Sequence, residues 1–219
     1  MDLIGLAFPA PWPGIGFAVA IPLLGWAGWR ARWRRLEGEH IHVWLATILG
    51  LALLWSVKAS LASGLVFHLL GVPLFTLLAG PWLALIGTAI AVAVVTIAGD
   101  GSWINGGLAV LALGVAPVVT TTVVLRAAER WLPPNPFVYI FVAAFFGPAL
   151  AMLTAGTLVA LGTIAAEALP APVVFQFLPY LLHLAFGEAT VTGMLVTLLV
   201  VYRPAWVGTF DNARYLRER

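Results

Sequence analysis

Long apolar runs dominate this chain, and short polar or glycine- and proline-containing segments separate them. A run of about 18 or more apolar residues is long enough for a helix to cross a bilayer. The pattern predicts about seven such helices, over residues 14–29, 43–61, 65–79, 82–98, 108–125, 137–165 and 173–202. Only Gly80-Pro81 separates the third run from the fourth, which indicates a tight turn there.

The last two runs are longer than a bilayer requires. Gly147-Pro148 predicts a kink in the run over residues 137–165, and helix tilt can accommodate the remaining length. We therefore predict an all-α, polytopic membrane helix bundle. It forms a single transmembrane domain over residues 1–219, with a C-terminal tail over about residues 203–219.

Composition supports a membrane protein, because 62% of the residues are hydrophobic and only 9% are charged. A soluble domain carries about 25% charged residues to cover its surface. The chain has no cysteine, which excludes disulfides and thiolate metal sites. It also has no glycine-rich phosphate loop and no evident Ser, His and acid arrangement, so we predict neither an enzyme nor a nucleic-acid partner.

The distribution of positive charge predicts an orientation. If the basic cluster at residues 30–35 is cytoplasmic, alternation of the spans places ten of the eleven Lys and Arg residues on that side. Lys58 is the exception, near the outer end of the second span. The positive-inside rule then predicts an N-terminus outside and a cytoplasmic C-terminus. This bias fits a multi-pass protein of the bacterial cytoplasmic (inner) membrane.

Ionisable side chains at membrane depth are costly and therefore mark candidate functional positions. Glu188, near the middle of the last span, is the strongest candidate. A structural hydrogen bond to a neighbouring helix, through Lys58 or a threonine hydroxyl, is an equally good interpretation. His68 could ligate a metal through a neutral imidazole nitrogen. For His68 and His183, spacing alone favours a histidine bonded to a backbone carbonyl, whereas Lys58 most simply reaches the outer headgroups.

Three segments, in order, resemble the CbiM/NikM family of membrane substrate-capture components of energy-coupling-factor transporters for cobalt and nickel. The first is residues 67–87, with the His-Leu-Leu-Gly motif at His68–Gly71 and the later Gly80-Pro81. The second is the Gly-Asp-Gly loop and following helix, over residues 99–115. The third is residues 183–196, with the Gly-Glu pair at Gly187-Glu188. The resemblance covers about residues 56–203 and implies the fold of that family.

The resemblance also implies a metal site and shows where this chain departs from it. Family members begin Met-His, and their amine, second-residue histidine and motif histidine hold the metal; here Asp2 stands at position two. His68 therefore carries over as a ligand, with Met1 and Asp2 as possible further ligands. Ala109 and Ala112 stand where the family has two asparagines. The remaining polar groups, which would support the site, are Glu188, His183, Asp100 and Lys58.

Three functions stay open on these grounds. The first is substrate capture for a divalent transition metal, nickel or cobalt, with a membrane T component and cytoplasmic ATPases as partners. The second, suggested by the missing histidine and asparagines, is a non-transporting subunit or assembly factor of a larger membrane complex. The third is capture of a small organic molecule, which a large apolar pocket lined by aromatic residues would favour.

Overall fold

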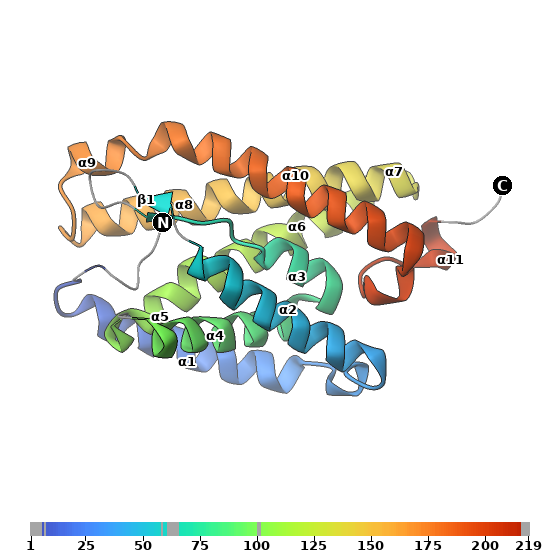
Figure 1. Ribbon diagram of the computed structural model, residues 1–219, viewed down its shortest axis with the longest axis horizontal. Helices are drawn as coiled ribbons and strands as arrows, with labels where there is room; N and C mark the ends of the chain where they lie inside the picture. Colours follow the sequence, from blue (N-terminus) through green and yellow to red (C-terminus); the bar gives the residue numbers. More distant parts are fainter. Residues whose placement is uncertain (1–5, 7, 58, 61–65, 100–101, 216–219) are drawn as a thin grey trace.

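The computed structural model describes residues 6, 8–57, 59–60, 66–99 and 102–215, and it shows long helices that run side by side (Figure 1). The first half contains α1 (Trp12–Arg30), η1 (Trp33–Arg35), α2 (Glu39–Ser56), β1 (Ala59–Ser60), β2 (Val66–Phe67), α3 (Val72–Ala79), α4 (Pro81–Ala98) and η2 (Trp103–Asn105). The second half contains α5 (Gly106–Ala109), η3 (Val110–Val115), α6 (Ala116–Trp131), α7 (Pro136–Val138), η4 (Tyr139–Phe146), α8 (Gly147–Ala165), α9 (Ala171–Phe175), α10 (Leu178–Tyr202), η5 (Pro204–Trp206) and α11 (Asn212–Tyr215). The predicted all-α membrane bundle is confirmed.

Among the described residues, five helical stretches are both long and apolar enough to cross a membrane. They are Glu39–Ser56, Pro81–Ala98, Trp103–Trp131, Pro136–Ala165 and Ala171–Tyr202. Helix α1 has 19 residues, which is long enough to cross, but it does not belong to this group. The predicted number of about seven spans and the predicted orientation of the termini therefore stay predictions.

The third predicted span, over residues 65–79, is wrong as a continuous helix. Strand β2 pairs antiparallel with β1, and only Val72–Ala79 is helical. Eight residues make a helix of about 12 Å, well short of the roughly 30 Å of a bilayer core. Gly71 adopts a left-handed conformation (φ 66°), and Pro73 lies in the first turn, where its missing N–H costs nothing. These two residues set the start of α3.

Two of the long stretches contain π-helical segments, and each lies just before a proline. Segment η3 ends two residues before Pro117, and η4 leads directly into Gly147-Pro148. Proline has no N–H, and its ring collides with the carbonyl four residues earlier. A widened π turn accommodates that collision. The irregularity predicted at Gly147-Pro148 is therefore a π-helical segment within a continuous helical stretch.

Close packing between helices depends on small residues. Helix α1 contacts α4 and α5, and α10 contacts α8, as Figure 1 also shows. A Cβ added to Gly107 would lie 2.4 Å from the backbone N of Phe17, so α1 and α5 touch backbone to backbone. The outer faces carry exposed apolar side chains, such as Leu49 and Leu53 of α2, which suits contact with lipid.

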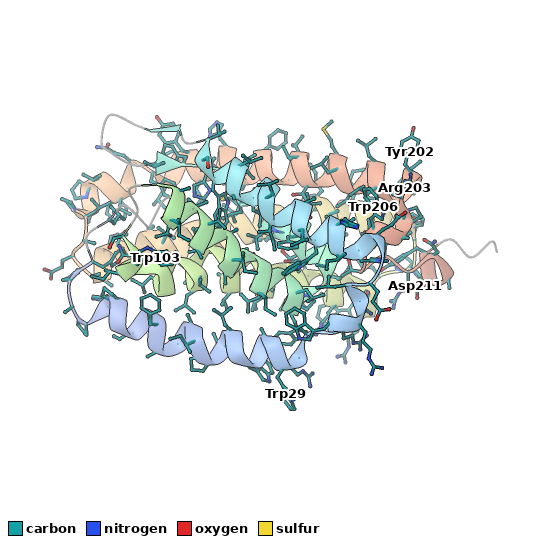
Figure 2. All side chains as sticks on the ribbon, turned by 60° about the horizontal axis from the view of Figure 1, so that its bottom comes forward. Trp29, Trp103, Tyr202, Arg203, Trp206 and Asp211 are labelled. Carbon is teal, nitrogen blue, oxygen red and sulfur yellow. The ribbon has the colours of Figure 1, made fainter. Side chains whose placement is uncertain are left out.

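Positive charge gathers at one end of the bundle. Four arginines line one cavity there: Arg30, Arg32, Arg35 and Arg126. Arg34 lines a neighbouring cavity. Three more lie at the end of α6, at the end of α10 and in α11: Arg130, Arg203 and Arg214. Figure 2 shows Arg203, Trp206 and Asp211 together at this end and Trp103 at the other. We call these the arginine-rich end and the opposite end. Lys58 lies outside the described residues.

Candidate functional site

The chain between β2 and α3, residues 68–71, is held in place from two sides. The indole Nε1 of Trp55, at the end of α2, donates to the carbonyl oxygen of Leu70 at 3.0 Å. The backbone N–H groups of Leu70 and Gly71 donate to the Glu188 carboxylate of α10, at 2.7 Å to Oε2 and 2.8 Å to Oε1. Both polar backbone groups of Leu70 are therefore satisfied by side chains from other helices.

Glu188 is buried, with 1% of its surface exposed, and both of its oxygens accept a backbone hydrogen. It forms the predicted bond to a neighbouring segment, but its partners are backbone N–H groups and no threonine hydroxyl. A carboxylate with two such donors is well placed at a helix N-terminus, because the helix dipole is positive there. Glu188 thus fixes the short segment that carries His68.

His68 is buried, and its ring packs against Trp55 with centroids 5.6 Å apart. Its Nδ1 lies 3.0 Å from the carbonyl oxygen of Leu69. Since a carbonyl oxygen can only accept, Nδ1 is the donor in this contact. Metal-ligating histidines have the same arrangement, in which one ring nitrogen is fixed by a carbonyl and the other binds the ion. The contact is also the carbonyl bond that spacing alone favours, so the geometry accommodates both interpretations.

His183 is not brought to this site. Its side chain is exposed, and its Nδ1 lies 3.1 Å from the carbonyl oxygen of Pro179, one turn earlier in α10. Glu188, five residues later, is buried on the inner face of the same helix. His183 therefore matches the carbonyl-bonded alternative. The other predicted site residues lie outside the described residues: Met1, Asp2, Lys58 and Asp100.

Within the described ranges, no three His, Asp or Glu side chains come together as a metal-binding group. An ion at His68 would therefore need ligands from the part of the chain that the structure does not describe, or from backbone atoms. This is compatible with the predicted contribution of the N-terminal residues. A metal site at His68 would therefore differ from one whose ligands are all side chains of the described helices.

Asn105 is a buried polar residue that the sequence interpretation missed. Its side chain is fully buried, and its Nδ2 donates to the carbonyl oxygen of Leu6. It lies four residues, about one helical turn, before Ala109, where the resemblance leads one to look for an asparagine. The sequence does contain a signal for it, because Asn105 is a lone amide between the Gly-Asp-Gly loop and a long apolar run. Asn105 ties the start of the described chain to η2.

An apolar groove of about 620 Å³ runs between α2, α3 and α10 and reaches Glu188 and Gly71. Its lining is mostly leucine, valine and other small apolar residues. Of the described residues along it, one is a tryptophan, Trp206, and none is phenylalanine or tyrosine. It therefore lacks the aromatic lining that would favour a small organic ligand.

The fold and this site together define a class: a multi-pass α-helical membrane protein in which a buried histidine sits on a segment that an intramembrane carboxylate holds. Residues 6–206 match the CbiM family, described as the cobalt uptake substrate-specific transmembrane region. The match covers most of the chain, and the protein belongs to this family. It is accordingly a transport protein of the metal-uptake class.

A solved structure supports the same fold. A protein described as a truncated transition metal transporter superposes with a TM-score of 0.72, covering 92% of this chain and 99% of the other. The two sequences are 16% identical, so the likeness concerns the fold alone. No curated protein matches the chain.

Proposed function

We propose that this protein is the membrane substrate-capture component of an energy-coupling-factor-type transporter for a divalent transition-metal cation, nickel or cobalt. The observation that carries the proposal is the buried His68, whose Nδ1 is bound to a carbonyl oxygen and whose ring is fixed by Trp55. The family of metal-uptake regions to which the chain belongs, and the fold of a transition metal transporter, support the same class of substrate.

In this proposal His68 binds the ion through Nε2, and Glu188 acts indirectly by holding Leu70 and Gly71. The Met1 amine and the Asp2 carboxylate complete the ligand set, which then has one imidazole fewer than the family pattern. A carboxylate is a harder ligand than imidazole. We therefore expect weaker binding of nickel and cobalt than a Met-His start gives.

Transport also requires energy, and the sequence has no phosphate-binding loop. The proposed partners are therefore a membrane T component and cytoplasmic ATPases. The proposed location is the inner membrane of a bacterium, with the N-terminus outside and the arginine-rich end in the cytoplasm. Substrate would then reach His68 from the opposite end of the bundle.

The test is the metal content of purified protein with its native Met1 start and no N-terminal tag, measured by mass spectrometry. We expect close to one nickel or cobalt ion per chain in the wild type and loss of that ion in His68→Ala. His183→Ala is the matched control, because that ring is exposed on α10, and it should retain the metal. No metal in the wild type after incubation with nickel, cobalt, copper and zinc would overturn the proposal.

One observation favours a second candidate, a non-transporting subunit of a larger membrane complex. Ala109 is fully buried and offers only a methyl group where the family has an asparagine. Co-expression with the T component and ATPases separates the two functions. ATP-dependent uptake of radioactive nickel or cobalt into cells supports transport, and co-purification with other membrane subunits without uptake supports the alternative.

A further inference from the structure

A cavity of about 680 Å³ lies at the arginine-rich end, where the end of α1, the α3–α4 turn and the last part of α6 meet. Its charged and aromatic lining consists of Trp29, Arg30, Arg32, Arg35, Trp82 and Arg126. None of the residues that line it belongs to the segment 68–71. Nothing in the proposed capture of a cation uses it.

The charges in this cavity all have one sign. Four guanidinium groups line it, and no aspartate or glutamate does. In the described part of the chain, no carboxylate lies within 4.0 Å of any of the four. Like charges that line one cavity repel one another and attract an anion. The positive-inside rule accounts for arginines at this end, but it does not require an arginine of α6 to line the same cavity as those at and after the end of α1.

The side chain of Arg126 is exposed, and its backbone lies before the end of α6. It precedes the last residue of α6 by five positions, which places its backbone about 7.5 Å inside the helix end. Trp82 lines the same cavity and contacts Arg30, whose guanidinium carbon is 6.0 Å from the ring centroid. Tryptophan and arginine together are typical of the headgroup level of a bilayer.

The outer side of the cavity is apolar. Trp29 is 80% exposed and projects away from the bundle, as Figure 2 shows, and Trp26 and Ile21 of α1 are also exposed. A ligand with a negatively charged head and a hydrophobic body would contact both surfaces at once. Planar guanidinium groups bind phosphate through paired hydrogen bonds, which suits this head.

We propose that this cavity binds the phosphate headgroup of an anionic phospholipid, with Arg126 and the arginines after α1 around the phosphate. The acyl chains lie along the exposed apolar face of α1. The bound lipid links α1, α4 and α6 at the arginine-rich end and neutralises charge that the described protein does not pair. Basic pockets between helices at the cytoplasmic side of membrane proteins recognise anionic lipids in this way.

The experiment uses the full chain in detergent micelles, to which phosphatidylglycerol or phosphatidylcholine with the same acyl chains is added. Native mass spectrometry counts the lipids retained by each protein molecule. Arg126→Gln is compared with Arg130→Gln, one turn later in α6, which removes the same charge from a residue that does not line the cavity. We expect the wild type to retain phosphatidylglycerol preferentially. Arg126→Gln should weaken that binding about fivefold, the effect of one basic residue near an anionic headgroup, and Arg130→Gln should not.

Three results would overturn the proposal. Equal retention of the two lipids by the wild type would show that the headgroup charge is not recognised. Equal loss in both variants would show that binding reflects the net charge of the surface and not the cavity. A third arm adds inorganic phosphate to the wild type. If phosphate at the lipid concentration displaces phosphatidylglycerol, the site takes a soluble phosphate and the assignment to a lipid is wrong; if the lipid stays bound, the assignment holds.

Discussion

The two ends of the short helix α3 are held by different groups, a side-chain carboxylate at one end and backbone N–H groups at the other. At its N-terminal end, the N–H groups of Leu70 and Gly71 donate to one carboxylate, that of Glu188. At its C-terminal end, the carbonyl oxygens of Leu77 and Leu78 accept from the backbone N–H groups of the C-terminal segment, Thr209 at 3.1 Å and Gly208 at 2.8 Å. Every helix leaves such groups without an intrahelical partner at its ends. A helix of eight residues inside a bundle depends heavily on how they are satisfied.

The C-terminal end has several supports that act together. The Thr209 hydroxyl also donates to the Leu77 carbonyl oxygen at 2.8 Å, and it lies 2.7 Å from the Tyr139 hydroxyl. The Tyr139 ring packs against Phe210 and Tyr215, with centroids 5.0 Å and 5.3 Å away. Residues 203–215, expected to form part of a tail, are therefore packed onto the bundle.

The difference predicts where stability and metal binding are coupled. Glu188 accepts from both N–H groups at the start of α3, on the segment that carries His68, so a change there should affect both properties. The contacts at the other end of α3 are more numerous and lie at the arginine-rich end. Changes there should lower stability in smaller steps and leave the site at His68 unaltered.

The largest effect is expected for Glu188→Ala. The substitution leaves the buried N–H of Leu70 and the half-buried N–H of Gly71 without their acceptor. Hydrogen bonds to a charged group contribute about 1.5–3 kcal/mol each. We expect the free energy of unfolding to fall by about 3 kcal/mol or more, measured by tryptophan fluorescence in detergent during thermal or chemical denaturation. The metal content should fall with it.

His183→Ala serves as the control on the same helix. That ring is exposed and bonds only within its own turn among the described contacts, so the change should cost less than about 0.5 kcal/mol. If Glu188→Ala were as stable as this control, the carboxylate would not support the segment in the folded protein. The N-terminal end of α3 would then not depend on Glu188.

A smaller effect is expected for Gly208→Ala, at the other end of α3. The added Cβ would lie 2.5 Å from the backbone carbonyl oxygen of Leu78, so the C-terminal segment must move away from α3. We expect a loss of about 2 kcal/mol, in the range of substitutions that create a steric clash, with the same denaturation assay. Metal content at His68 should not change.

Gly162→Ala in α8 is the matched control for this change. Nothing lies within 4 Å of its added Cβ, and alanine favours helix over glycine, so stability should stay equal or rise by up to about 1 kcal/mol. Loss of metal from Gly208→Ala would contradict the proposed separation between the two ends.

Much of the fold follows from the length of the apolar runs. The predicted spans over residues 82–98 and 137–165 coincide with α4 (Pro81–Ala98) and the stretch Pro136–Ala165 to within one residue. Contact with lipid requires long apolar helices, and the sequence records this directly. The run over residues 65–79 misleads because a buried extended segment is as apolar as a buried helix.

The sequence predicts which residues belong to the site, but not the hydrogen bonds between them. His68 and Glu188 stand out as ionisable residues in apolar stretches, and this can be read directly from the sequence. The bond between Glu188 and Leu70 joins positions 118 residues apart, and no spacing rule reaches that far. Asn105 was missed for a related reason, because its partner is a backbone carbonyl near the start of the chain.

The smallest effect is expected for Tyr139→Phe, which removes one hydroxyl and keeps the ring against Phe210. Thr209 retains its own bond to the Leu77 carbonyl oxygen, so the cap of α3 persists. The cost should be about 1 kcal/mol, that of one neutral hydrogen bond, read from the same denaturation curves. A loss as large as that of Glu188→Ala would show that the C-terminal support depends on a single side chain. A small loss would show that several contacts share it, so that α3 tolerates change at one end and not at the other.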